Sequence, residues 1–180
     1  MRVVLPRALT GVLVAGVVLA RHADRTSWLA VALVVALVPI TLIDLERRII
    51  PNRILAPLAV AAIVLTALFE PGQLLERLVA GAAAGGFLLA AALAHPRGMG
   101  MGDVKLAAVM GLILGRGVVP GLLVALLTGS LVGIAVMVRR GVAEGRRTAI
   151  PFGPFLALGA LVGVFAGNAL VDAYVHTFLG

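Results

Sequence analysis

The sequence predicts an all-α polytopic membrane protein, a single domain over residues 1–180 that forms a bundle of about six to seven transmembrane helices. Two observations predict this fold class. Hydrophobic residues make up 62% of the chain and charged residues only 13%, whereas a soluble domain has roughly half and a quarter. The mean hydropathy is +1.15, and so short a chain cannot bury that much apolar surface in one aqueous core. Membrane lipid is therefore the expected environment.

Apolar segments separated by charged or Pro- and Gly-containing breaks give the expected helices. Several of them approach the roughly 20 residues that a helix needs to cross a bilayer. The fifth is too short to cross upright, so we expect it to be tilted, interfacial or buried against its neighbours. In chain order the segments cover residues 3–20, 27–43, 54–69, 75–94, 104–115, 117–138 and 152–178.

The first segment allows two interpretations. Arg2 and Arg7 precede an apolar run that ends near Ala20, which is the pattern of a secretory signal peptide. The cleavage-site signal is weak, so a retained helix is favoured. The expected topology of the later segments is the same in both cases.

Basic residues divide unequally between the two sides of these spans, and such residues collect in cytoplasmic loops. The side with more of them is therefore expected to be cytoplasmic, with the amino terminus inside and the carboxyl terminus outside. Basic cytoplasmic loops then explain the net charge of +7. Nucleic-acid binding is not expected, because the sequence has no nucleic-acid-binding module. The cytoplasmic set is Arg2, Arg7, Arg47, Arg48, Arg53, Arg97, Lys105, Arg139, Arg140, Arg146 and Arg147, and the outer set is Arg21, Arg25, Arg77 and Arg116.

Glycines recur four residues apart in several segments, as at Gly81 and Gly85 or at Gly159 and Gly163. This spacing lets helix backbones approach closely in lipid. Packing within one bundle is the favoured interpretation, and a homo-oligomer formed through these faces is the alternative.

Two acidic residues stand at the predicted membrane boundary. Asp44 ends the second apolar segment and Asp103 begins the fifth, both on the expected cytoplasmic side. A carboxylate there is costly unless it is paired or functional. Taken singly, Asp103 has the alternative role of a helix N-cap, and Asp44 that of an interfacial group near Arg47 or Arg48. Together they suggest a carboxyl pair that shares one proton, in which one group activates water and the other polarises a carbonyl.

Gly100 and Gly102 precede Asp103 and suit that use, because glycine permits a sharp turn and a close approach to a bound strand. A simple hinge is the alternative. The residues that other kinds of catalysis need are missing. The sequence has no cysteine, which excludes thiolate catalysis and Cys-ligated zinc, and it has no H-E-x-x-H zinc-binding motif. Ser27 and Ser130 have no histidine partner in a recognisable pattern. No metal or cofactor is expected.

Three sequence blocks resemble those of the type IV prepilin peptidases, and the match covers about residues 30–165. Their order along the chain makes the resemblance far more specific than a single G-x-G-D motif. The blocks are Asp44 with Ile50-Pro51-Asn52, then Gly100-Met101-Gly102-Asp103-Val104-Lys105-Leu106, and last Ile150-Pro151-Phe152-Gly153-Pro154-Phe155.

The resemblance implies a membrane aspartic endopeptidase of the bacterial cytoplasmic membrane, with roles in type IV pilus assembly and protein secretion. Such enzymes remove a short basic leader from pilin or pseudopilin precursors after a glycine, at the cytoplasmic face. Carried over by position, Asp44 and Asp103 are the catalytic pair, and Gly100 and Gly102 shape the loop. Pro51, Asn52, Lys105, Pro151 and Gly153 match motif positions without an assigned chemical step.

Many members of that family carry an additional amino-terminal methyltransferase region with a cysteine-ligated zinc. The sequence contains neither feature, so we expect a short, protease-only member that does not methylate its product. Two other functions stay open. One is a presenilin-like protease that cuts inside a transmembrane helix, and the other is a non-enzymatic transporter or assembly factor in which Asp44 and Asp103 bind protons or ions.

Overall fold

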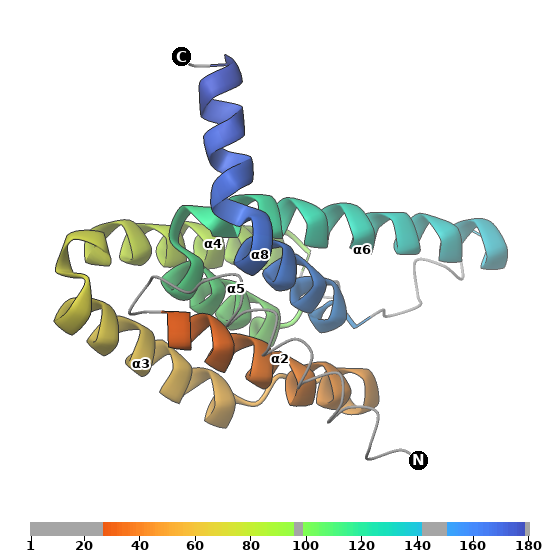
Figure 1. Ribbon diagram of the computed structural model, residues 1–180. Helices are drawn as coiled ribbons and strands as arrows, with labels where there is room; N and C mark the ends of the chain where they lie inside the picture. Colours follow the sequence, from red (N-terminus) through yellow and green to blue (C-terminus); the bar gives the residue numbers. More distant parts are fainter. Residues whose placement is uncertain (1–26, 96–98, 142–150, 179–180) are drawn as a thin grey trace, which may run out of the picture.

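The computed structural model describes residues 27–95, 99–141 and 151–178, and these ranges are helical without any strand (Figure 1). The all-α prediction is thereby confirmed. The segment expected at residues 3–20 lies outside the described residues, so both interpretations of it stay predictions. In chain order the elements are α2 (Ser27–Arg47), α3 (Asn52–Phe69), η1 (Pro71–Gln73), α4 (Leu74–Ala94), α5 (Met101–Leu114), η2 (Gly115–Gly117), α6 (Val118–Arg140) and α8 (Gly153–Phe178).

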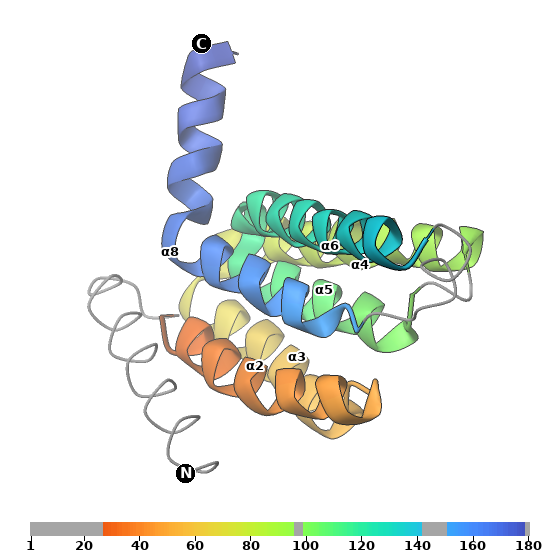
Figure 2. The same cartoon turned by 90° about the vertical axis from the view of Figure 1, so that its right-hand side faces the viewer.

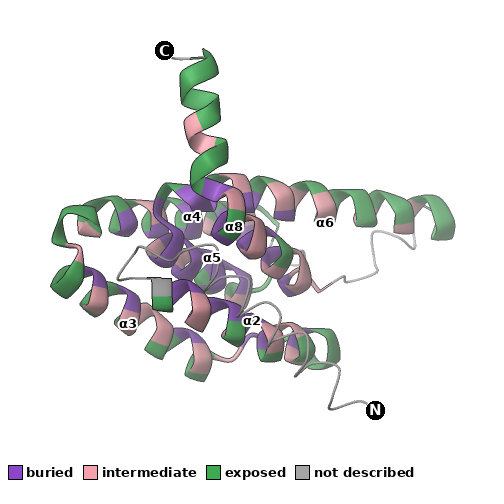
Figure 3. Ribbon diagram, viewed as in Figure 1, coloured by how far each residue is buried: buried purple, intermediate pink, exposed green. Residues whose placement is uncertain are grey.

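The described ranges contain five helical stretches that are long and apolar enough to cross a membrane. One of these spans, Met101–Arg140, combines α5 and α6. Large apolar side chains face outward, among them Leu75, Leu93 and Val138, and Figure 3 shows the exposed outer faces of the helices. Such a surface suits lipid and not water, so the polytopic membrane prediction is confirmed.

The short helix α5 lies at the centre of the bundle, where it contacts α2, α3, α4, α6 and α8 (Figure 2). Leu106, Ala107 and Met110 are fully buried on it. Of the three placements expected for the fifth segment, burial against its neighbours is therefore the one observed. The contact with α4 is close, because a Cβ on Gly111 would lie only 2.5 Å from the carbonyl oxygen of Ala80.

Glycines also bring α6 and α8 together. A Cβ on Gly159 would overlap the carbonyl oxygen of Gly121, and one on Gly163 would lie 3.0 Å from that of Gly117. These contacts show that the small-residue spacing serves packing inside the bundle, as the sequence favoured. The carboxyl-terminal part of α8 projects away from the other helices (Figure 1) and is largely exposed.

Candidate functional site

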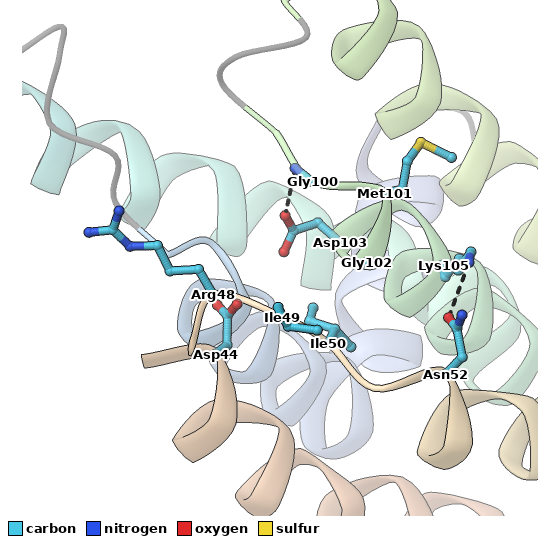
Figure 4. A pocket seen from close by; sticks show the side chains of 10 residues that line it. All are labelled: Asp44, Arg48, Ile49, Ile50, Asn52, Gly100, Met101, Gly102, Asp103 and Lys105. Carbon is cyan, nitrogen blue, oxygen red and sulfur yellow. Dashed lines mark hydrogen bonds between the residues drawn. The ribbon is translucent and has the colours of Figure 1, made fainter. Parts of the chain in front are cut away.

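A cavity of about 270 Å³ lies where the end of α2 approaches the start of α5. Both predicted aspartates line it, and Figure 4 shows their carboxyl groups facing the same space from the two helices. We call it the aspartate cavity. Its lining is Asp44, Arg48, Ile49, Ile50, Asn52, Gly100, Met101, Gly102, Asp103 and Lys105.

Asp44 lies in the last turn of α2, within the helix and not beyond its end. The prediction ended this segment at residue 43, because an apolar run marks contact with lipid and not the limit of backbone hydrogen bonding. The helix ends at Arg47, and Arg48, the next residue, has a φ of 54°. A residue in this left-handed conformation commonly follows the end of a helix. The Arg48 N–H donates to the carbonyl oxygen of Asp44 at 2.9 Å. The added turn leaves Asp44 only 5% exposed.

The Asp44 carboxyl group is held by the start of α8. The backbone N–H of Gly153, the first residue of that helix, donates to Asp44 Oδ2 at 2.9 Å. A helix amino terminus favours a carboxylate. A Cβ at position 153 would lie 2.6 Å from the same oxygen, so only glycine lets the backbone come this close. The sequence matched Gly153 to a motif without a role, and the structure gives it contact with Asp44.

Asp103 is the third residue of α5, which begins at Met101 and has Gly100 as its N-cap. The expectation that Asp103 precedes the helix as an N-cap is therefore wrong: the helix starts earlier because Gly100 already takes the extended N-cap conformation. Asp103 Oδ2 accepts the Gly100 N–H at 3.2 Å, as an acidic residue does in a capping box. The capping role thus occupies one carboxyl oxygen.

The second carboxyl oxygen of Asp103, Oδ1, is buried and has no hydrogen-bond partner among the described residues. The residue as a whole is 8% exposed. A buried polar atom without a partner is uncommon, and each one calls for an explanation such as a catalytic role or a bound water. Helix capping alone does not explain Oδ1, which remains available to a substrate or a water in the aspartate cavity.

The two motif glycines differ in what they do. Gly100 has φ −83° and ψ 149°, an extended conformation open to any residue, so the sharp-turn explanation is wrong for it. Gly102 lies within α5, and among the described glycines only Gly115 and Gly141 have positive φ. Its role is a close approach, because a Cβ there would lie 2.8 Å from the Cβ of Ile50. The second sequence block therefore packs directly on the first.

The remaining motif residues lie at or near the starts of α3, α5 and α8. Lys105 Nζ on α5 donates to Asn52 Oδ1 on α3 at 3.1 Å. Pro51 is the N-cap of α3, with an extended φ of −70° and ψ of 123°. Pro151 is partly buried two residues before α8. In the described part of the chain, no group of three or more His, Cys, Asp or Glu side chains is placed to hold a metal ion.

The family described as the type IV leader peptidase family matches residues 31–138. The prepilin leader peptidase/N-methyltransferase of Xanthomonas campestris pv. campestris is 34% identical over 156 residues, which are 82% of this chain and 53% of the relative. That of Bacillus subtilis (strain 168) is 33% identical over 159 residues, 84% of this chain and 60% of the relative.

The chain thus spans 53–60% of the length of these two curated relatives. A further protein of the same name, from Aeromonas salmonicida, is 32% identical over 83% of this chain and 53% of its own length. No solved structure matches the chain.

Proposed function

Because the chain belongs to the type IV leader peptidase family, we propose that it is an aspartic endopeptidase that removes the leader from type IV prepilin-like precursors. One observation carries this proposal. Asp44 and Asp103 come from separate sequence blocks, are both buried, and line the same cavity. The relatives are named prepilin leader peptidases, which supports pilin or pseudopilin precursors as the substrate class.

The proposed reaction uses the two carboxyl groups differently. Asp44, which accepts the Gly153 N–H at the start of α8, serves as the carboxylate that takes a proton from water. The water oxygen bonds to the scissile carbonyl carbon while Asp103, protonated, donates to the carbonyl oxygen through its free Oδ1. The tetrahedral intermediate then collapses: the former carbonyl oxygen returns its proton to Asp103 as the C=O bond re-forms, the C–N bond breaks, and the proton on Asp44 passes to the leaving amine.

The experiment that tests this function is co-expression with candidate prepilins from the same organism. We expect the mass of one or more precursors to fall by the mass of its leader when the chain is present. The negative control is the chain carrying Asp44→Asn and Asp103→Asn together, at matched membrane levels. If every candidate keeps its leader beside the properly inserted wild-type protein, the proposal is wrong.

The location of the pair bears on the two alternative functions. Asp44 is in the last turn of α2 and Asp103 in the first turn of α5, so both lie at helix ends and not midway along a span. This supports cleavage beside the membrane over cleavage within a transmembrane helix. A transporter that carries ions on these carboxylates would leave precursors uncut. The co-expression experiment therefore also distinguishes a transporter from a peptidase.

We further propose that the site faces the cytoplasm of a bacterial cell, in the cytoplasmic membrane. The ends of α2 and α6 and the start of α8 lie toward the same side of the bundle, on the right in Figure 1. Basic residues occupy the last turns of α2 and α6, namely Arg47, Arg139 and Arg140. Cytoplasmic loops carry such an excess of basic residues.

The orientation can be tested by cysteine labelling, because the sequence has no native cysteine. Glu46→Cys, beside the pair, and Thr177→Cys, near the end of α8, both place the thiol at an exposed position. In sealed spheroplasts we expect an impermeant maleimide to label Thr177→Cys but not Glu46→Cys. After permeabilisation it should label Glu46→Cys as well. Labelling of Glu46→Cys in sealed spheroplasts would reverse the orientation.

Gly102→Val is expected to lower leader cleavage strongly while the protein still inserts. Any side chain at position 102 meets Ile50, and a valine has two further carbons that force α5 and the Ile50 loop apart. A displacement of about 1 Å at a reacting group is enough for a loss of roughly 100-fold. The matched control is Gly86→Val on α4, where a Cβ would have no atom within 4 Å. Wild-type cleavage by Gly102→Val would show that this contact does not position Asp103.

A further inference from the structure

A second cavity, of about 450 Å³, adjoins the aspartate cavity. Asn52 and Lys105 line both cavities, so the two meet at the hydrogen bond that joins these side chains. We call the second cavity the α3–α5 groove. Its lining is Asn52, Leu55, Ala56 and Ala59 of α3, with Lys105, Ala108, Val109 and Leu112 of α5.

The two walls of the α3–α5 groove follow the same pattern. On each helix the lining residues are spaced i, i+3, i+4 and i+7, which is one face of an α-helix. That face extends over about two turns, or roughly 10 Å. Beyond the polar pair of Asn52 and Lys105, every lining side chain is apolar. Ala56, Ala59 and Ala108 are small, and small residues let the backbone of another helix approach closely in lipid.

The groove has a direction. Asn52 is the first residue of α3, and Lys105 lies near the start of α5. The later lining residues, up to Ala59 and Leu112, lie deeper along both helices. The groove therefore leads from the carboxyl pair, past the Lys105–Asn52 hydrogen bond, along the apolar span of α3.

We propose that the α3–α5 groove binds the apolar helix that follows the cleavage site of the substrate. This inference rests on the proposed peptidase function. The expected leader is short and basic, so a segment that lies in this apolar groove belongs to the part of the substrate that follows the cut. In lipid such a segment has to be helical, because its backbone groups must be hydrogen-bonded internally. Another apolar groove among the described residues, of about 260 Å³ between α4 and α6, shares no lining residue with the aspartate cavity. Continuity with the carboxyl pair thus selects the α3–α5 groove.

Filling the groove tests the proposal. Ala59→Trp, or Ala56→Trp as a second variant, puts an indole where the substrate helix would lie. Two substrates are compared: the full precursor that the wild-type enzyme cleaves, and a peptide of the same sequence that ends a few residues after the cut. We expect the ratio of kcat/KM for the precursor to kcat/KM for the peptide to fall about tenfold, the effect of losing one well-packed contact.

The matched control is Ala83→Trp, which fills the α4–α6 groove from another exposed alanine and should leave that ratio unchanged. Thermal unfolding in detergent identifies variants that fail to fold. An unchanged ratio in both folded groove variants would overturn the proposal, as would an equal fall in Ala83→Trp. If the wild-type enzyme cleaves neither substrate, the peptidase function fails, which is a distinct result.

Photocrosslinking identifies the occupant directly. A photoreactive residue at position 56, which is exposed in the groove, is expected to join the apolar segment of the precursor when the inactive Asp103→Asn enzyme is used. The same residue at position 83 should not. Adducts only with lipid, or only with residues 3–20 of the chain itself, in the presence of the precursor would show that another occupant fills the groove.

Discussion

Asp44→Asn and Asp103→Asn are each expected to lower leader cleavage by about 10²- to 10⁴-fold, the range that general acid–base groups contribute. Asparagine keeps the shape of aspartate and still offers an oxygen. The amide oxygen introduced at position 44 can accept the Gly153 N–H, and the one at position 103 can accept the Gly100 N–H, as the native carboxyl groups do. If these carboxyl groups only cap helices, the variants should behave like the wild type. If they catalyse, nearly all activity should be lost.

The measurement is the fraction of precursor that loses its leader, with each variant at the same membrane level. Glu46→Gln is the matched control, because Glu46 is an exposed carboxylate in the same turn of α2 and should be dispensable. The double variant should be about as inactive as either single one, since groups that act as a unit lose their effect together. Substantial cleavage by either single variant would remove that residue from the mechanism.

The helices could be predicted from the sequence because lipid requires nearly every outward position to be apolar. The helix ends could not, as the cases of Asp44 and Asp103 show. Both fall outside the apolar runs that define the expected segments, yet both lie inside helices. Hydropathy marks where a chain leaves lipid, whereas a helix ends where its backbone hydrogen bonds end. At this site the difference is one turn, and that turn carries the carboxyl groups.

Burial was harder to predict than helicity. The central position of α5 has no periodic signal, because beyond Lys105 its residues are apolar on every side. Arg77 was counted among the basic residues of the outer side, at the start of the expected segment 75–94, and its burial near the start of α4 was not predicted. Its guanidinium binds Glu70 at 2.9 Å and Gln73 at 2.9 Å. A buried arginine with such partners cannot be distinguished from a loop arginine by counting charges.

The candidate pair itself could be proposed from the sequence, since carboxylates at a membrane boundary are costly and few. The contacts that position it could not. Gly153 and Asp44 are 109 residues apart, and no local pattern indicates that an amide of one donates to the carboxyl group of the other. The contact between Gly102 and Ile50 also joins residues that are far apart in sequence. The motif positions could be identified from the sequence, but the contacts that explain them form only when the helices pack together.

Gly153→Ala is expected to reduce kcat by roughly 100-fold, the loss that a displacement of about 1 Å at a reacting group can cause. The added Cβ would lie 2.6 Å from Asp44 Oδ2 and 3.0 Å from its carboxyl carbon. The contact resolves most easily if the Asp44 side chain rotates, which breaks its hydrogen bond to the amide. In the proposed mechanism Gly153 acts only through Asp44, as a positioning residue, so we expect KM to change little.

Alanine substitutions at two other glycines distinguish a local effect on Asp44 from a general effect of replacing glycine in a helix. Alanine favours a helix over glycine by about 0.5–1 kcal/mol, so Gly86→Ala on α4, with open space around it, should be as active as the wild type and no less stable. Gly159→Ala, in the same helix as Gly153, meets Gly121 of α6 and should lower thermal stability through packing. A kcat for Gly153→Ala equal to that of Gly86→Ala would show that the start of α8 does not hold Asp44 in its catalytic position. A fall in thermal stability that matches Gly159→Ala would assign the loss to packing instead.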